Sequence, residues 1–179
     1  MKYMIASDIH GSAKFCRELL NAWKREKPDK LVLLGDLLYH GPRNPLPEGY
    51  DTFAVFAMLN EHKNELLCVR GNCDAEVDQM VLDFPMMADY AMLDLKDRHV
   101  FVTHGHLFSM EQPPKMQKGD WLLHGHTHVP AWTPFGNENL YLNPGSVSIP
   151  KDGTPHGYML MDDDRVLWKT LDGTVYHEL

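Results

Sequence analysis

Cysteine and basic residues are scarce in this sequence. The three cysteines, Cys16, Cys68 and Cys73, are odd in number and form no CxxC pair, so a thiolate zinc site is not predicted. The 17 Lys and Arg residues are outnumbered by 25 Asp and Glu residues, which gives a formal net charge of -8. Binding to long duplex nucleic acid relies on Lys and Arg, so we expect no such partner.

Long apolar runs are also lacking. No run approaches the ~20 residues that cross a bilayer, so we expect no membrane partner. The opening residues 1–11 turn polar at Asp8 and His10 and lack the pattern of a secretory signal. These absences predict a cytoplasmic protein with reduced thiols. They are compatible with a homo-oligomer.

The first half of the chain alternates short apolar runs with amphipathic stretches. Its length of 179 residues is sufficient for one domain, which we expect to span 1–179. The apolar runs predict strands within 3–7, 30–36 and 65–74. The amphipathic stretches predict helices over 12–27, 50–63 and 75–84, the first with Ser12 as N-cap and the second burying Phe53, Phe56 and Leu59.

The second half consists mostly of strand-like runs separated by Gly, Pro and Asp. These runs cover residues 90–95, 99–106, 120–126, 140–145, 157–163 and 165–171. Together the halves predict a mixed α/β fold in which sheets are layered with helices. The alternation predicts parallel pairing early in the chain and antiparallel pairing late.

Polar side chains follow the predicted strands wherever a strand ends. Since ligands collect outside the carboxyl ends of strands in layered α/β folds, we expect these side chains to meet. The candidates are Asp8, His10, Asp36, Asn72, His104, His126 and His128. Oxygen donors mixed with imidazole suit Mn, Fe, Zn or Co. Seven ligands are too many for one tetrahedral ion and fit two ions about 3.5–4 Å apart.

One stretch, "LLHGHTHVP" at 122–130, places three histidines at alternate positions. In an extended chain these side chains point to one side, so a merely polar strand face is an alternative to a metal site. His126 and His128 match the ligand pattern above. His124 precedes the turn, and we expect it to be an ordinary polar residue near the site.

Five motifs, taken in order, resemble the calcineurin-like metallophosphoesterase superfamily. They are Asp8-x-His10, Gly35-Asp36, Gly71-Asn72, His104-Gly-His106 and Gly125-His126-Thr-His128. The resemblance runs from about residue 4 to residue 149. "YHGPRN" (39–44), "RGNCD" (70–74) and "NPGSVSIPK" (143–151) look like the small bacterial YfcE-type phosphodiesterases in particular.

The resemblance implies a four-layer sandwich of two mixed β-sheets flanked by helices. It also implies two divalent metal ions, with Mn preferred and Zn, Fe, Co or Ni as alternatives, and hydrolysis of a small phosphodiester by a metal-bridging hydroxide. One ion would be bound by Asp8, His10, Asp36 and His128. The other would be bound by Asp36, Asn72, His104 and His126. Asp36 bridges the ions in this scheme, and Asp36, Asn72 and His104 take part in catalysis.

Other residues are weaker candidates for substrate contact or support. Many relatives carry histidine where this chain has Cys73, and a buried thiol without a chemical role is an equal alternative there. Asp74 is expected either to orient a ligand or to cap a helix. Arg43 and Asn44 lie in a proline-rich loop that forms the expected pocket rim, and His106 is expected to support the ligands.

Competing functions remain open at this stage. The same dinuclear site would also serve a phosphomonoesterase or a nucleotide pyrophosphatase. A fold of this kind can also be a protein-binding scaffold without catalysis. Scaffold relatives have lost some of the histidines, whereas this chain keeps the full ligand set, which favours an enzyme.

Overall fold

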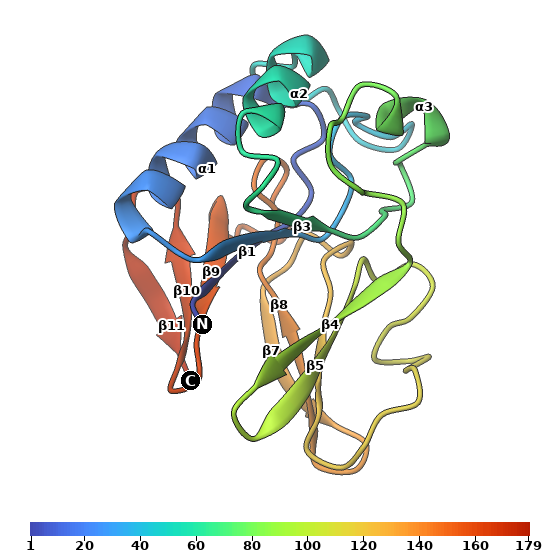
Figure 1. The fold of residues 1–179 in the computed structure, drawn as a ribbon, viewed down its shortest axis with the longest axis vertical. Helices are drawn as coiled ribbons and strands as arrows, with labels where there is room; N and C mark the ends of the chain where they lie inside the picture. The colour runs from blue at the N-terminus through green and yellow to red at the C-terminus, as the bar shows by residue number, and fades with distance from the viewer.

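Alternating side chains along short apolar strands build a first sheet of six strands. The computed structural model describes residues 1–179 (Figure 1). This sheet has the order β11-β10-β9-β1-β2-β3, with β1, β2 and β3 parallel and the other pairs antiparallel. Its strands are β1 (Tyr3–Ala6), β2 (Lys30–Leu33), β3 (Leu66–Cys68), β9 (Gly157–Met161), β10 (Val166–Thr170) and β11 (Val175–Glu178).

The second sheet has five strands in the order β4-β5-β6-β8-β7. They are β4 (Tyr90–Leu95), β5 (Arg98–Thr103), β6 (Trp121–Leu123), β7 (Ala131–Phe135) and β8 (Asn139–Asn143). Strands β5, β6 and β8 pair in parallel. The expectation of antiparallel pairing late in the chain is therefore wrong for these two pairs, although β4 pairs with β5 and β7 with β8 in antiparallel fashion. Loops and the edge strand β7 make the crossovers here, so the chain shows no helix pattern that would mark parallel strands.

Two strands were not expected from the sequence, and both lie at sheet edges. β7 contains Pro134, which has no N–H for a ladder and is tolerated in strands mainly at edges. β11 is a short terminal strand that pairs only with β10. Edge strands bury one side or less, so their hydrophobic pattern is weak.

Helices α1 (Ala13–Glu26), α2 (Thr52–Asn60) and α3 (Glu76–Gln79) all begin close to their predicted positions. Ser12 caps α1, since its hydroxyl accepts the Phe15 N–H at 3.3 Å. α3 is shorter than expected because the Gln79 amide binds the carbonyl oxygens of Leu82 and Phe84, which replaces further helical turns.

Helix α2 departs from its predicted burial. Val55 and Leu59 are its buried residues, whereas the Phe53 side chain is 75% exposed and Phe56 is half-buried. The residues of α2 are apolar on nearly every side, so periodicity could not tell which face meets the core.

Two hydrophobic clusters hold the layers together. In β1, Met4 and Ala6 face α1 and α2, while Tyr3 and Ile5 face the second sheet. The two mixed sheets packed face to face are thereby confirmed. On the outer side of the second sheet the layer is a loop instead of a helix: Phe108, in the segment between β5 and β6, packs on Phe101 with ring centroids 5.4 Å apart.

None of the three helices has the length and hydrophobicity that a bilayer-spanning segment requires.

The end of α1 is fixed to the first sheet by a carboxylate. The Tyr158 hydroxyl donates to Glu26 Oε1 at 2.8 Å, and the Lys169 ammonium donates to the same oxygen. Burial alone would raise the pKa of Glu26, but these two partners lower it below its ordinary value. The contribution of Glu26 to stability is therefore present above the pKa of the unfolded chain and is lost as the pH falls through the folded value.

We predict that Glu26→Gln lowers the free energy of unfolding by about 1–2 kcal/mol at pH 7, because a charged acceptor is lost from both contacts. The deficit should shrink as the pH falls below the ordinary glutamate pKa of about 4.3 and then through the lowered pKa of Glu26 in the folded protein. Urea denaturation of wild-type protein and of Glu26→Gln at pH 7, 5 and 3.5 measures this difference in the free energy of unfolding. Glu18→Gln on the same helix is the control. A deficit that is the same at all three pH values would contradict the prediction.

Candidate metal centre

The loops after the strands carry unusual backbone conformations. Asp8, His10, Asp36, His126 and His128 all have positive φ, between 49° and 66°. Eight residues other than glycine have positive φ in this chain, so most of them are predicted ligands. Each such residue costs of order 1 kcal/mol, and the cost persists only where surrounding contacts hold the loop. The strain is concentrated at the predicted site.

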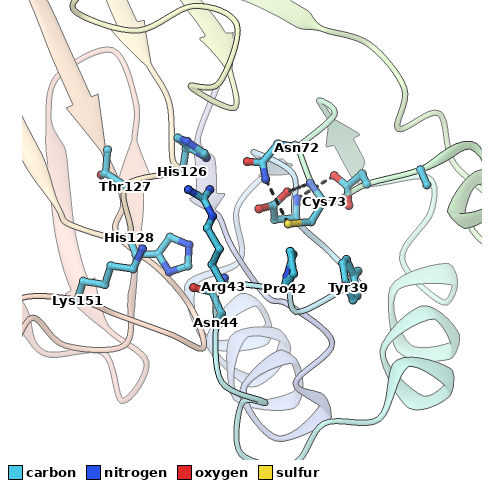
Figure 2. A pocket seen from close by; sticks show the side chains of 14 residues that line it. Tyr39, Pro42, Arg43, Asn44, Asn72, Cys73, His126, Thr127, His128 and Lys151 are labelled. Carbon is cyan, nitrogen blue, oxygen red and sulfur yellow. Dashed lines mark hydrogen bonds between the residues drawn. The ribbon is translucent and has the colours of Figure 1, made fainter.

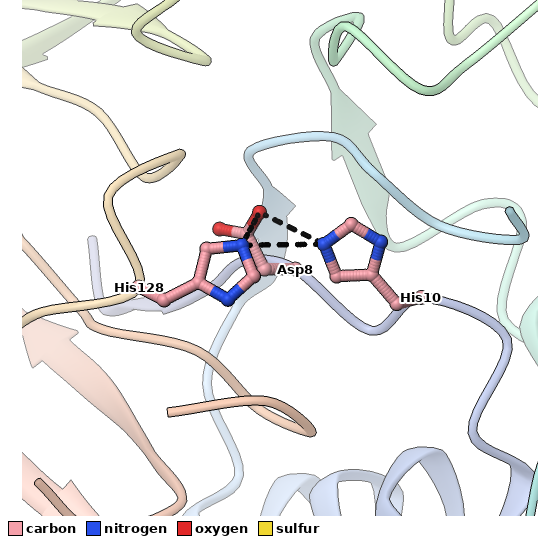
Figure 3. A group of neighbouring side chains, drawn as sticks. All are labelled: Asp8, His10 and His128. Carbon is pink, nitrogen blue, oxygen red and sulfur yellow. Dashed lines mark hydrogen bonds and ion pairs between the residues drawn. The ribbon is translucent and has the colours of Figure 1, made fainter. Parts of the chain in front are cut away.

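The first cluster joins Asp8, His10 and His128, which all lie buried. Asp8 Oδ1 is 3.4 Å from His10 Nε2 and 3.2 Å from His128 Nε2, and the two Nε2 atoms are 3.3 Å apart. Figure 3 shows the two rings approaching from opposite sides with their Nε2 atoms facing each other beside the Asp8 carboxylate. Three ligand atoms thus converge on one point.

Backbone carbonyl groups fix the tautomers of three histidines. His10 Nδ1 donates to the Tyr39 oxygen at 2.8 Å, His104 Nδ1 to Leu34 at 2.7 Å and His128 Nδ1 to Ile149 at 2.7 Å. A carbonyl oxygen only accepts, so each Nδ1 must carry the proton. In the neutral ring, Nε2 is then an unprotonated nitrogen, the form that binds a metal.

Asp36 lies between the first cluster and a second one. Its Oδ2 is 3.6 Å from His10 Nε2 and 3.5 Å from His104 Nε2. Its Oδ1 accepts the Cys73 N–H at 2.8 Å, which fixes the orientation of the carboxylate. The ligand atoms of Asp8, Asp36 and His104 also lie within 4.8 Å of one another. One carboxylate therefore reaches both groups of histidines.

The second cluster is formed by His104, Asn72 and His126. His104 Nε2 lies 3.1 Å from Asn72 Oδ1 and 3.1 Å from His126 Nδ1. These residues follow β5, β3 and β6 respectively, so the carboxyl ends of strands from both sheets meet here. All seven predicted ligands are thus brought together.

The protein itself offers too few partners to the buried charged groups of this site. Asp8 Oδ1 is buried and has no hydrogen-bond partner. Burial would raise the pKa of Asp8, but the rings of His10 and His128 hold it well below its usual range. Burial would lower the pKa of His104, yet Asp36 and Asp8 raise it to about 9. Two buried carboxylates that draw on histidines for positive charge fit a site for divalent cations.

Glycines allow the loops to approach this closely. A Cβ on Gly71 would collide with Asp36 Oδ1, and a Cβ on Gly125 would collide with the Ser7 hydroxyl. Asp74 joins the loops after β2 and β3: its carboxylate accepts N–H groups of Asp36 at 2.8 Å, Leu37 at 2.9 Å and Gly71 at 2.7 Å. Of its two expected roles, this geometry matches the orienting one.

A cavity of about 800 Å³ opens onto the metal centre. Arg43 and Asn44 line it, as expected for the rim loop, and Figure 2 shows Arg43 extending between His128 and Cys73. Sequence reasoning missed Lys151 and Tyr39, which also line it. Lys151 ends the quoted "NPGSVSIPK" stretch, which was a usable signal for it.

Cys73 and the remaining histidines surround the ligands. Burial and the nearby charge of Asp36 raise the pKa of the Cys73 thiol to about 12, so the thiol stays protonated. Its sulfur accepts from Asn72 Nδ2 at 3.2 Å. His106 lies half-buried with its ring 5.4 Å from that of His104. His124 is buried against Tyr141, with ring centroids 4.2 Å apart, and burial lowers its pKa to about 4.

Comparisons with known proteins identify the family. Phosphodiesterase YfcE of Escherichia coli (strain K12) is 48% identical over 164 residues, which cover 92% of this chain and 89% of that protein. A solved structure of YfcE, described as a phosphoesterase from E. coli, covers 100% of this chain and 98% of its own, with a TM-score of 0.95 and 45% identity.

A more distant structure, Vacuolar Protein Sorting 29 from Cryptosporidium parvum, shares the fold alone: its TM-score is 0.63 at 16% identity, with 99% of this chain and 97% of that chain covered. The model of the "Calcineurin-like phosphoesterase superfamily domain" matches residues 1–165. This chain therefore belongs to the calcineurin-like phosphoesterase superfamily.

Proposed function

We propose that this protein is a phosphodiesterase that uses two divalent cations to hydrolyse small phosphodiesters. The observation that carries the proposal is the position of Asp36, whose Oδ2 lies within 3.6 Å of a histidine nitrogen from each cluster. A carboxylate shared between two such clusters is the arrangement of two-metal phosphoesterases. The likeness to the phosphodiesterase YfcE supports the same reaction.

In this proposal each cluster holds one cation. Asp8, His10, Asp36 and His128 hold the first; Asp36, Asn72, His104 and His126 hold the second. When bound, the cations supply Lewis-acid activation of water and of the phosphoryl oxygens. Mn is the preferred ion, with Zn, Fe, Co or Ni as alternatives, because imidazole favours these ions over Mg.

The remaining residues position and select the substrate. Arg43 and Lys151 bring two positive charges to the cavity wall of an acidic protein, and we assign them to the phosphoryl oxygens. Asp74 holds the backbone of both metal-binding loops. Cys73 offers no imidazole acid to the leaving group, which favours diesters with stabilised leaving groups.

A phosphomonoesterase or a nucleotide pyrophosphatase on the same site are the alternative activities. A non-catalytic scaffold is the less favoured alternative, because the backbone strain is concentrated on the ligands. We also propose one domain over 1–179 and a cytoplasmic location, which the three free cysteines support. A panel of diesters, monoesters and nucleotides, assayed with each divalent ion, tests the activity. Turnover of phosphomonoesters without any turnover of phosphodiesters would contradict the proposed function.

We predict that Asp36→Asn disrupts both metal sites and lowers kcat/KM by ~100-fold or more, because the substitution removes the shared charged ligand. The bound metal, measured by elemental analysis, should fall from two equivalents per chain to fewer than one. Asp97→Asn, in the exposed turn between β4 and β5, is the matched control. At most one equivalent in fully active wild-type protein would disprove the dinuclear arrangement.

We predict that protein stripped by a chelator is inactive and that Mn²⁺ restores more activity than Mg²⁺. The clusters contain four histidines whose Nε2 or Nδ1 atoms face the site, and Mg²⁺ prefers oxygen ligands and water. Rates are measured after adding each ion to buffer freed of trace metals. Full recovery with Mg²⁺ alone would show that the imidazoles are not the ligands.

We predict that wild-type protein prefers an aryl phosphodiester over an alkyl phosphomonoester and that Cys73→His narrows this preference. An imidazole acid helps a poor leaving group most. Cys73→Ala and Cys73→Ser should keep most of the diesterase activity, because the thiol is protonated and assigned no nucleophilic role. The measurement is kcat/KM for both substrates. Loss of diester turnover in Cys73→Ala with both metals still bound would make the thiol catalytic.

A further inference from the structure

A second cavity, of about 320 Å³, lies between α2 and α3. We call it the apolar groove; seven of its nine lining residues are hydrophobic, among them Tyr39, Tyr50, Phe53, Phe56, Val77 and Val81. Its volume is at the lower end for small-molecule sites, which are mostly apolar. None of its lining residues is among the seven predicted metal ligands.

Several large hydrophobic side chains of the apolar groove are exposed to solvent, although apolar side chains are stabilised by burial. Phe53 is 75% exposed and Val77 is 63% exposed. Helix α2 buries only Val55 and Leu59, although nearly all of its residues are apolar. Exposed apolar residues gathered in one patch mark a binding surface more often than isolated ones do.

The apolar groove is continuous with the cavity over the metal centre. Tyr39 lines both cavities. Asp74 and Ala75 line the metal cavity, and Val77, two residues after Ala75, lines the groove. Figure 2 shows Tyr39 on the opposite side of the metal cavity from Lys151. The groove therefore starts where the metal cavity ends, on the side away from the positive charge of Lys151.

A phosphodiester bound at the metal centre has two ester arms, and they must leave the phosphorus in different directions. Towards Arg43, Asn44 and Lys151 the cavity is polar and cationic. Past Tyr39 the surface is apolar. We propose that the apolar groove binds an apolar ester arm, alkyl or aryl, of the phosphodiester substrate; this rests on the proposed function. The preferred substrates are then mixed diesters with one apolar arm.

The test compares methyl and hexyl p-nitrophenyl phosphate, which share one leaving group and differ only in the second arm. Wild-type protein should hydrolyse the hexyl diester with a kcat/KM about 10-fold or more above that of the methyl diester, because added methylenes become buried. Phe53→Asp and Val77→Asp should reduce this ratio towards one. Phe53 is exposed in the first turn of α2, where an acidic residue is compatible with the helix.

Val175→Asp is the matched control, since Val175 is 46% exposed on β11 at the far edge of the first sheet. It should leave the ratio unchanged. A wild-type ratio near one, or a ratio that survives both groove variants, overturns the inference while leaving the proposed function intact. A change in oligomeric mass in Phe53→Asp with an unchanged ratio assigns the groove to a contact between copies, and also overturns it.

Calorimetry with methyl and hexyl phosphate on metal-loaded protein repeats the comparison without turnover. Tighter binding of hexyl phosphate that is lost in Val77→Asp and kept in Val175→Asp supports the inference. Equal affinities overturn it. Absence of hydrolysis of either diester counts against the proposed function, and the calorimetric result then decides the groove separately.

Discussion

The burial of two carboxylates, Asp8 and Asp36, is the constraint on which the rest of this structure depends. Each charge raises the free energy of the other, and neither is exposed to water. Burying such charges costs several kcal/mol unless opposite charge lies close by. The protein surrounds them with imidazoles and backbone N–H groups instead of Lys or Arg. That choice leaves the compensation by the protein incomplete, which fits a site that binds metal.

The architecture places these carboxylates by joining two sheets at one end. β1 and β2 lead to Asp8, His10 and Asp36 from the first sheet, while β5 and β6 lead to the other three histidines from the second. The Asp74 carboxylate then ties two of the loops through three backbone N–H groups. Because residues from both sheets contribute to one cluster, packing between the sheets sets the distances within the site.

Much of the site was predictable from the sequence because each ligand follows a short apolar strand and most of the ligands stand beside a glycine. The motifs at Asp8, Asp36 and Asn72 are local and need no knowledge of the tertiary fold. Lys151 and Tyr39 were missed because their place in the cavity depends on how distant loops pack. The two expected roles of Asp74 were not separable, since its partners include residues nearly forty positions away.

The fold was predictable in class and less so in detail. The central strands carry strong apolar runs, whereas the edge strands β7 and β11 bury too little to show a pattern. The parallel pairing of β5, β6 and β8 was missed because no helix connects them. Phe53 was expected in the core because the sequence of α2 is apolar on most sides and does not indicate which face is buried.

The hydrogen bonds that orient the histidines have an evolutionary consequence. His10 and His128 are held by the carbonyl oxygens of Tyr39 and Ile149, and every amino acid offers that oxygen. The side chain of Tyr39, by contrast, faces the cavities. Position 39 can therefore change its side chain without withdrawing its support from His10. The lining of both cavities can thus change at a residue whose backbone holds His10, which gives a small enzyme a route to a differently shaped cavity without disturbing its cluster of Asp and His side chains.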